Sequence, residues 1–133
     1  MNRELKFRVW DKVDRQYLKE LGVYYWHVSR SLLGEELEGE ANLYDLSILL
    51  RNKSFVVQQY TGLTDGKGNN IYEGDILSHN GKIGTVYYNA DRAGFVLEWE
   101  YSSHEQNYVN LTCDVVYESS NIGNIFKNPE LLK

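Results

Sequence analysis

The chain has 133 residues, of which 42% are hydrophobic and 25% charged; this size and composition predict one globular domain over residues 1–133 and exclude a disordered chain. The formal net charge of −5 disfavours nucleic acid as a partner, because attachment to phosphates needs a basic face. The single cysteine excludes an internal disulfide. The sequence has neither a signal-peptide pattern nor an apolar run of the roughly 20 residues that cross a membrane. We therefore expect a cytoplasmic protein with no membrane partner.

Two strands are predicted near the N-terminus. Apolar and polar side chains alternate from Leu5 to Trp10, the period-two pattern of a strand, and residues 11–16 then form a turn. The next stretch, Tyr17–Val28, is denser in apolar residues, and its part Val23–Val28 is apolar on both faces. A strand of that kind is covered on both sides, and another subunit is one candidate for the second cover.

A helical pattern follows between Ser31 and Leu50. Apolar side chains recur there at spacings of four, four, three and four, at Leu33, Leu37, Ala41, Tyr44 and Ile48. Two glycines and an acidic run interrupt the first half of this pattern. We therefore expect a loop first and then one short helix over Leu46–Leu50, with Asp45 as its N-cap.

The centre of the chain is dense in turn residues. A strand over Phe55–Tyr60 leads into a glycine-studded hairpin, Leu63–Ile71, whose aspartate, glycine and asparagine residues suit a tight reversal. The dipeptide Asn80-Gly81 is the strongest hairpin signal in the chain, because both residues tolerate positive φ. It predicts a two-residue turn between strands over 76–80 and 81–88.

Further strands complete a predicted antiparallel meander. A hairpin at Asn89–Gly94 leads to a strand over Phe95–Trp99, and two more strands are predicted over Tyr108–Tyr117 and Ile122–Phe126. The last one is ended by Pro129, the only proline. Short strands at intervals of roughly ten residues predict a mainly β fold, a small antiparallel barrel or sandwich with its core over about residues 55–126.

Two carboxylates have the spacing of a catalytic acid–base pair. Glu73 and Asp75 lie two apart in an extended stretch, so they project to one face, as a general acid–base pair would. Solvated turn chemistry accounts for them better, because spacing places no histidine or nucleophile beside them. The sequence predicts a protein that is not an enzyme, with an enzyme using these two carboxylates as an alternative.

No cofactor and no metal are predicted. Residues 65–73 partly match a calcium-binding loop, but Lys67 occupies a ligand position and Asn70 stands where glycine is required. A plain turn explains this stretch better. The residue types that bind zinc are scattered without the short spacings of structural sites, at His27, His79, His104 and Cys113.

Aromatic side chains are the better candidates for a binding surface. Tyr87 and Tyr88 are neighbours on a predicted strand and point to opposite faces, so one of them faces outward. The same holds for Tyr24 and Tyr25, and exposed tyrosine and tryptophan are favoured at protein interfaces. The predicted binding residues are Tyr72, Glu73, Asp75, Tyr87, Tyr88 and Trp99.

A basic cluster lies in the first predicted hairpin. Four cations with aromatic residues between them are one way to bind nucleic acid, and here they are Lys6, Arg8, Lys12 and Arg15. Acidic residues are interspersed among them, which favours a solvated face of mixed charge.

Three blocks of the sequence resemble one protein family. They are Lys6–Asp11 (KFRVWD), Gln59–Asp65 (QYTGLTD) with Gly68–Ile76 (GNNIYEGDI), and Ile122–Leu131 (IGNIFKNPEL). Together and in this order they resemble the YopX family of phage and prophage proteins. The resemblance implies a mainly β fold with an SH3-like barrel, self-association, an origin in a bacteriophage or prophage, and no established activity or catalytic residues. It does not extend to residues 18–51.

These observations predict a phage or prophage accessory protein that acts by binding in the cytoplasm of its bacterial host. We expect a homo-oligomer whose contacts use Val23–Val28 and Thr85–Tyr88, and a phage or host protein is a further candidate partner. The alternative is an SH3-like nucleic-acid-binding module in phage DNA metabolism, which the acidic net charge disfavours. The second alternative is an enzyme that uses Glu73 and Asp75.

Overall fold

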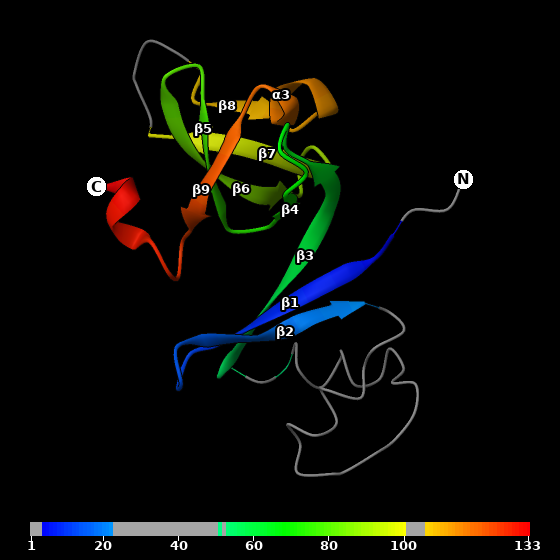
Figure 1. The fold of residues 1–133 in the computed structure, drawn as a ribbon, viewed down its shortest axis with the longest axis vertical. Helices are drawn as coiled ribbons and strands as arrows, with labels where there is room; N and C mark the ends of the chain where they lie inside the picture. Colours follow the sequence, from blue (N-terminus) through cyan, green and yellow to red (C-terminus); the bar gives the residue numbers. More distant parts are fainter. Residues whose placement is uncertain (1–3, 23–50, 52, 101–105) are drawn as a thin grey trace. The chain divides into compact units, whose positions relative to one another are not determined.

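A computed structural model of the chain describes residues 4–22, 51, 53–100 and 106–133. The chain divides into two compact units, Met1–Gln59 and Tyr60–Lys133, which Figure 1 shows with their strands labelled. The elements of the described residues are β1 (Lys6–Asp11), β2 (Gln16–Gly22), β3 (Phe55–Thr64), β4 (Asn70–Tyr72), β5 (Asp75–His79), β6 (Lys82–Asn89), β7 (Gly94–Trp99), β8 (Tyr108–Asn110), α3 (Cys113–Tyr117), β9 (Ser120–Asn124) and the 3-10 helix η1 (Pro129–Leu132).

The first unit is built on a hairpin of β1 and β2. The turn between them is held by Asp11, whose Oδ1 accepts hydrogen bonds from the backbone N–H groups of Val13 at 2.8 Å and Asp14 at 3.1 Å. Consecutive residues Val9 and Trp10 are both buried, with exposures of 0% and 5%. Since neighbours on a strand point to opposite faces, β1 is covered on both faces at this point.

Strand β3 takes part in both units. Its first half pairs antiparallel with β1, from Phe55 opposite Asp11 to Gln59 opposite Phe7. Its second half pairs antiparallel with β4. The register of this pairing shifts between Tyr60 and Thr64 of β3. Gly62 lies inside that shift at φ +86°, a left-handed conformation that glycine adopts without steric cost.

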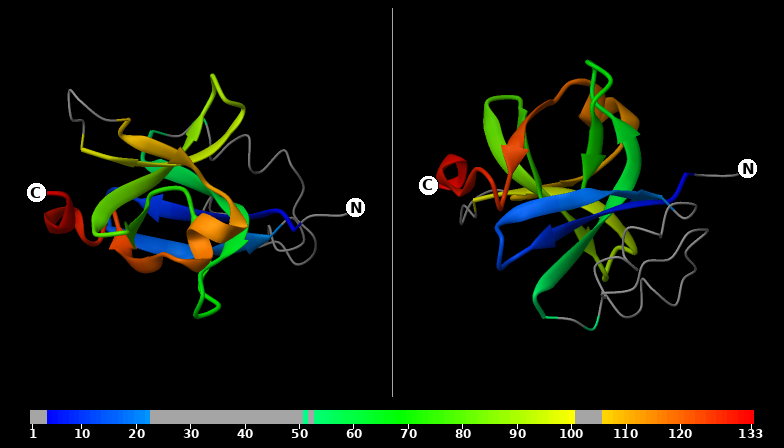
Figure 2. Two further views of the ribbon diagram at one scale, coloured as in Figure 1. Left: turned by 90° about the horizontal axis from the view of Figure 1, so that it is seen from above. Right: turned by 60° about the horizontal axis from the view of Figure 1, so that its bottom comes forward.

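The second unit contains a five-stranded antiparallel sheet in the order β8-β7-β6-β5-β9. The two views of Figure 2 show this sheet curling over on itself. Its buried apolar cluster comes from β4, three sheet strands and α3, and consists of Ile71, Leu77, Val86, Leu97 and Val116. Because these side chains come from five elements between residues 71 and 116, the core closes only when the whole meander is in place.

The predicted turns of this unit are confirmed. Asn80 and Gly81 have φ values of +49° and +76°, and the pair His79 and Lys82 closes the hairpin on either side of them, as a two-residue turn with positive φ requires. The Leu63–Ile71 hairpin is present as the reversal from β3 to β4. The third predicted hairpin is closed where Asn89 pairs with the first residue of β7.

The strand predicted over Tyr108–Tyr117 was wrong in its second half. Pairing with β7 ends at Asn110, and residues 113–117 form α3. Thr112 is its N-cap, with its side-chain oxygen accepting from the N–H of Val115 at 3.3 Å. The single helical turn places Val116 in the core at 0% exposure, and this packing overrides the strand preference of the two valines.

Two other boundaries differ from the predictions. The last strand was expected over residues 122–126, but β9 lies two residues earlier and pairs with β5. The strand expected over Tyr17–Val28 is described as β2 only to Gly22. The strand residues Val23–Val28, the helix over Leu46–Leu50 with Asp45, and the residues His27 and His104 lie outside the described residues.

The mainly β, antiparallel architecture is therefore confirmed, with very little helix among the described residues. The SH3-like topology and a single domain over 1–133 stay predictions. Within the parts of the chain that the structure describes, no helix is both long enough and apolar enough to cross a membrane.

Candidate binding surface

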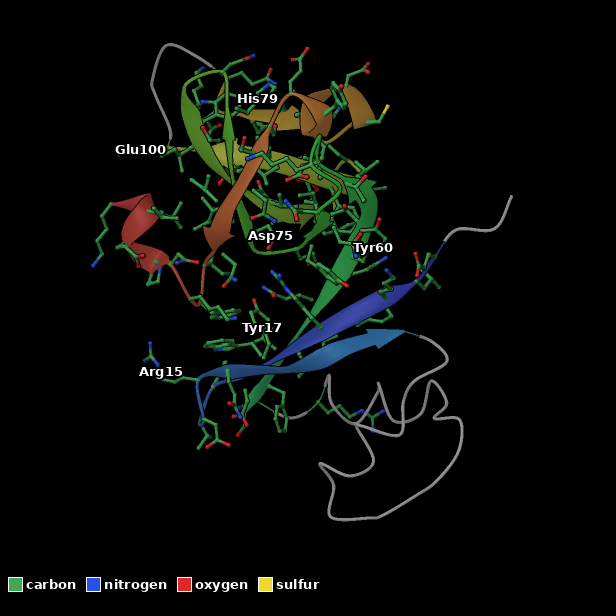
Figure 3. All side chains as sticks on the ribbon, viewed as in Figure 1. Arg15, Tyr17, Tyr60, Asp75, His79 and Glu100 are labelled. Atoms are coloured by element: carbon green, nitrogen blue, oxygen red, sulfur yellow. The ribbon has the colours of Figure 1, made fainter. Side chains whose placement is uncertain are left out.

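Asp75 lies in the interior of the second unit. Its exposure is 2%, and Figure 3 shows it where β5 begins, beside β9. Its Oδ2 accepts hydrogen bonds from the backbone N–H of Tyr72 at 2.8 Å and from Nδ2 of Asn121 at 3.0 Å. The carboxylate thereby holds the turn between β4 and β5 and fastens it to β9, a structural role that leaves little of its surface for a ligand.

The neighbours of Asp75 differ in their accessibility. Tyr72 is buried, with an exposure of 5%, and its ring lies 5.4 Å from that of Tyr60 on the paired strand. Glu73 is half-buried in the turn between β4 and β5. Of the predicted binding residues around this turn, Glu73 is thus the one with a substantial accessible surface, and their role in binding stays a prediction.

Asp65 fixes the β3–β4 turn. It is 5% exposed, and its two carboxylate oxygens accept from the N–H groups of Lys67 and Asn69, both at 2.9 Å, and from the Asn69 amide at 3.1 Å. The backbone N–H of Asn121 approaches the same carboxylate at 3.5 Å. This is the turn chemistry predicted for the stretch, and among the described residues no group of three or more histidine, cysteine, aspartate or glutamate side chains is arranged to hold a metal.

Acid should weaken the second unit through this residue. Desolvation by burial raises the pKa of Asp65, but the hydrogen bonds from Asn69, Lys67 and Asn121 outweigh it, and the pKa lies below its usual value of 3.8. The ionised form thus stabilises the fold above that value, and this contribution is lost as the pH falls through the lower, folded-state pKa. We expect Asp65→Asn to unfold at a lower urea concentration at pH 6 and to lose less stability than the wild type between pH 4 and pH 2. Equal acid dependence of the two proteins would contradict this.

Tyr87 and Tyr88 do point to different faces, as predicted. The hydroxyl of Tyr87 donates to Oε2 of Glu98 on the neighbouring strand at 2.5 Å. This hydrogen bond, more than burial, raises the pKa of Tyr87 above its usual value of 10.0. Tyr88 is 49% exposed, and its ring meets Phe95 edge to face at 5.5 Å. Tyr88 is therefore the more exposed aromatic of the pair.

Trp99 lines a surface hollow of about 820 Å³ at one end of β6 and β7. We call it the tryptophan hollow and define it by Trp99, Ile83, Leu131 and Leu132, which supply its large apolar side chains. Ile83 is 43% exposed and Leu132 is 48% exposed. These side chains come from β7, β6 and η1, so the C-terminal segment adds to the apolar lining that the two strands supply.

Charged groups of both signs surround these apolar side chains. Lys82 Nζ lies over the Trp99 ring at 4.5 Å from its centroid, a distance at which a cation is attracted to the ring face. The charged residues of the hollow are Lys82, Lys133, Glu98 and Glu100. Figure 3 labels Glu100, which directly follows the last residue of β7. An apolar centre with a charged rim is the composition of a protein-binding surface.

A serine and a histidine meet at the C-terminal end of β5, a pair that the sequence did not indicate. Oγ of Ser119 lies 3.0 Å from Nδ1 of His79 and donates to the carbonyl oxygen of Val115 at 2.5 Å. Since the hydroxyl hydrogen is directed at Val115, the hydrogen shared with Nδ1 belongs to the imidazole. Ser119 is 5% exposed. A nucleophilic serine would instead donate to the histidine, so this pair fastens α3 to β5.

The basic residues of the first hairpin are partly engaged. Lys6 forms an ion pair with Glu4 at 3.1 Å. Arg8 lies over the Tyr17 ring at 4.6 Å from its centroid and donates from Nε to Oε1 of Gln58 at 2.8 Å. Lys12 and Arg15 are exposed. Half of the predicted basic cluster thus serves contacts within the first unit.

One comparison with known proteins shows the family and another shows the fold. The family described as YopX protein matches residues 6–133. Among solved structures, the chain is similar to protein EF1440 from Enterococcus faecalis, with 20% sequence identity, coverage of 99% of this chain and 100% of that chain, and a TM-score of 0.59. A likeness at this identity shows a shared fold. None of the curated proteins matches the sequence.

Proposed function

The chain belongs to the YopX family, and from that premise we propose that it is a non-enzymatic phage or prophage accessory protein that works by binding, as a homo-oligomer, in the cytoplasm of the bacterial host. The observation that carries the proposal is the tryptophan hollow with its exposed Ile83 and Leu132. Large apolar side chains that are gathered in one hollow at a protein surface mark interaction sites more often than scattered ones do.

The charges of the hollow favour a second copy of the chain as its occupant. In a two-fold symmetric dimer the same patch faces itself, so it must be complementary to itself. A rim with two lysines and two glutamates meets this condition, since each cation has an anion available on the partner. Of the strands expected to form the contacts, Thr85–Tyr88 contributes Thr85 to the hollow, whereas Val23–Val28 lies outside the described residues.

Sedimentation velocity at micromolar concentration tests this proposal. We expect the wild type to associate and Ile83→Glu and Leu132→Glu each to shift it toward the monomer, because both place a carboxylate in the apolar centre of the contact. The expected weakening is about 2 kcal/mol, or roughly thirtyfold in the dissociation constant. Both positions are partly exposed, so urea unfolding should change by less than about 1 kcal/mol.

Tyr117→Glu is the matched control. Tyr117 is 74% exposed in α3 and does not line the hollow, so the substitution adds the same charge elsewhere on the second unit and should leave association unchanged. A wild-type protein that sediments as a monomer would overturn the proposal. So would association that is equally strong in Ile83→Glu and the wild type.

Nucleic-acid binding is the second candidate function. It is favoured by Arg8, which is stacked on Tyr17, and by the exposed Lys12 and Arg15 in the same hairpin. Binding to single-stranded oligonucleotides that weakens steeply with salt and is reduced in Lys12→Ala would support it. Absent or salt-insensitive binding would remove it.

A further inference from the structure

A second hollow, independent of the tryptophan hollow, lies around the hairpin turn between β6 and β7. The turn is fixed by Asn89, whose backbone carbonyl and side-chain Oδ1 both accept from the N–H of Arg92 at 3.2 Å. The next residue, Ala93, has φ +51°, a left-handed conformation that costs a residue with a Cβ roughly 1 kcal/mol. The backbone on both sides of Arg92 therefore has one defined conformation.

The side chain of Arg92 is held in place by the neighbouring strand β8. Its guanidinium lies over the Tyr108 ring at 4.6 Å from the centroid. Nη1 donates to Oδ1 of Asn110 at 3.3 Å, and Nη2 donates to the hydroxyl of Tyr108. The Arg92 side chain is exposed to solvent even though its guanidinium donates two hydrogen bonds within the protein.

Both of these acceptors are neutral. Among the described residues, no carboxylate lies within ion-pair distance of the Arg92 guanidinium. The charge is thus oriented but not neutralised, and the remaining N–H groups of the planar fork are available. Such a fork matches a carboxylate in a bidentate geometry.

The surroundings of Arg92 define what else a ligand must carry. The hollow has a volume of about 850 Å³, and its walls include Phe95 and Leu111, which are both partly buried. Asp91 also lines it, is exposed and has no hydrogen-bond partner among the described residues. The hollow therefore offers one cation, one carboxylate and an apolar wall.

We propose that this hollow, which we call the arginine hollow (Arg92, Tyr108, Asn110, Asp91, Phe95 and Leu111), binds an acidic segment of a partner protein. Arg92 takes a glutamate or aspartate carboxylate of the segment, a neighbouring apolar side chain packs on Phe95 and Leu111, and Asp91 accepts from the backbone N–H of the segment. A nucleic-acid strand fits less well, because its sugar–phosphate backbone has no N–H group to donate to Asp91 and no apolar side chain to pack on Phe95 and Leu111.

Fluorescence anisotropy with a defined probe tests the proposal. The probe is a fluorescein-labelled peptide of alternating glutamate and leucine, blocked at both ends, and the matched peptide carries glutamine in place of glutamate. We expect the full-length protein to bind the glutamate peptide and Arg92→Ala to bind it about tenfold more weakly or worse, as for the loss of a charge-assisted hydrogen-bonded pair. Arg92→Lys should recover only part of the affinity, because lysine keeps the charge and lacks the fork.

Arg15→Ala is the matched control for charge. Arg15 is also exposed, lies in a hairpin turn and has a positive φ of 55°, so its removal changes the net charge equally and should leave peptide binding unchanged.

Tyr108→Phe, which keeps the ring under the guanidinium but removes the hydroxyl, should weaken binding less than Arg92→Ala. Ile83→Glu should have no effect, which separates this site from the self-association surface.

Three results would overturn the proposal. The first is no binding of the glutamate peptide, or equal binding of the glutamine peptide. The second is an equal loss of affinity in Arg15→Ala and Arg92→Ala, which would indicate only a long-range effect of net charge. The third is binding that depends on Arg92 for labelled single-stranded oligothymidylate and not for the peptide, which would assign the hollow to nucleic acid.

Discussion

Replacing Asp75 by alanine is expected to destabilise the second unit by about 3 kcal/mol. The substitution removes both hydrogen bonds to Oδ2, from the Tyr72 N–H and the Asn121 amide, and leaves a buried backbone N–H without its acceptor. Asp75→Asn keeps the shape and one acceptor oxygen, so we expect a loss of about half that size. Urea unfolding at neutral pH, followed by tyrosine and tryptophan fluorescence, measures both differences.

Asp91→Asn serves as the control for this series. It makes the same chemical change at an exposed aspartate of the same unit and should alter the free energy of unfolding by less than about 0.5 kcal/mol. If Asp75→Ala unfolds at the same urea concentration as the control, the carboxylate does not hold the β4–β5 turn.

The Gly123→Ala substitution is expected to cost about 3 kcal/mol, for two reasons that add. Gly123 has φ +155°, a conformation that residues with a Cβ rarely adopt. A Cβ at this position would also lie 2.7 Å from Cγ of Asn128, whose Oδ1 accepts from the N–H of Asn124 at 3.2 Å. The clash would thus displace the side chain that fastens the end of β9 to the start of η1.

Gly94→Ala is the matched glycine control. A Cβ there would have only one neighbour, the carbonyl oxygen of Arg92 at 3.8 Å, and φ is not in the left-handed region. We expect a change within about 0.5 kcal/mol of the wild type in urea unfolding. A Gly123→Ala protein as stable as Gly94→Ala would contradict the conformation described for residue 123.

Local signals in the sequence predicted the local features of the fold. The Asn80-Gly81 turn was predictable because two adjacent residues determine it, and their φ values are positive as the dipeptide requires. Helix α3 was not, because Val115 and Val116 favour a strand by propensity, and only the position of Val116 in the core makes one helical turn the better solution.

The candidate binding surface likewise combines residues that the local sequence indicated with residues that only the folded chain brings together. Trp99 was predictable as a candidate binding residue because tryptophan is enriched at interfaces, but Ile83 joins it through the pairing of β6 with β7 and Leu132 through the folded C-terminus. The interior position of Asp75 depends on Asn121, 46 residues further along the chain. Likewise, nothing near Arg92 in the sequence indicates that Tyr108 and Asn110, 16 and 18 residues away, hold its guanidinium. Contacts at such separations follow from tertiary packing and have no local sequence pattern.

Cys113, the first residue of α3, is exposed and is the only cysteine of the chain. A maleimide spin label would therefore attach to the natural protein at one known position, with no background cysteine to remove. Pairs of labels would then report the symmetry of the assembly by dipolar spectroscopy. A two-fold dimer gives one label-to-label distance, whereas a head-to-tail array gives a series of distances that lengthens with protein concentration.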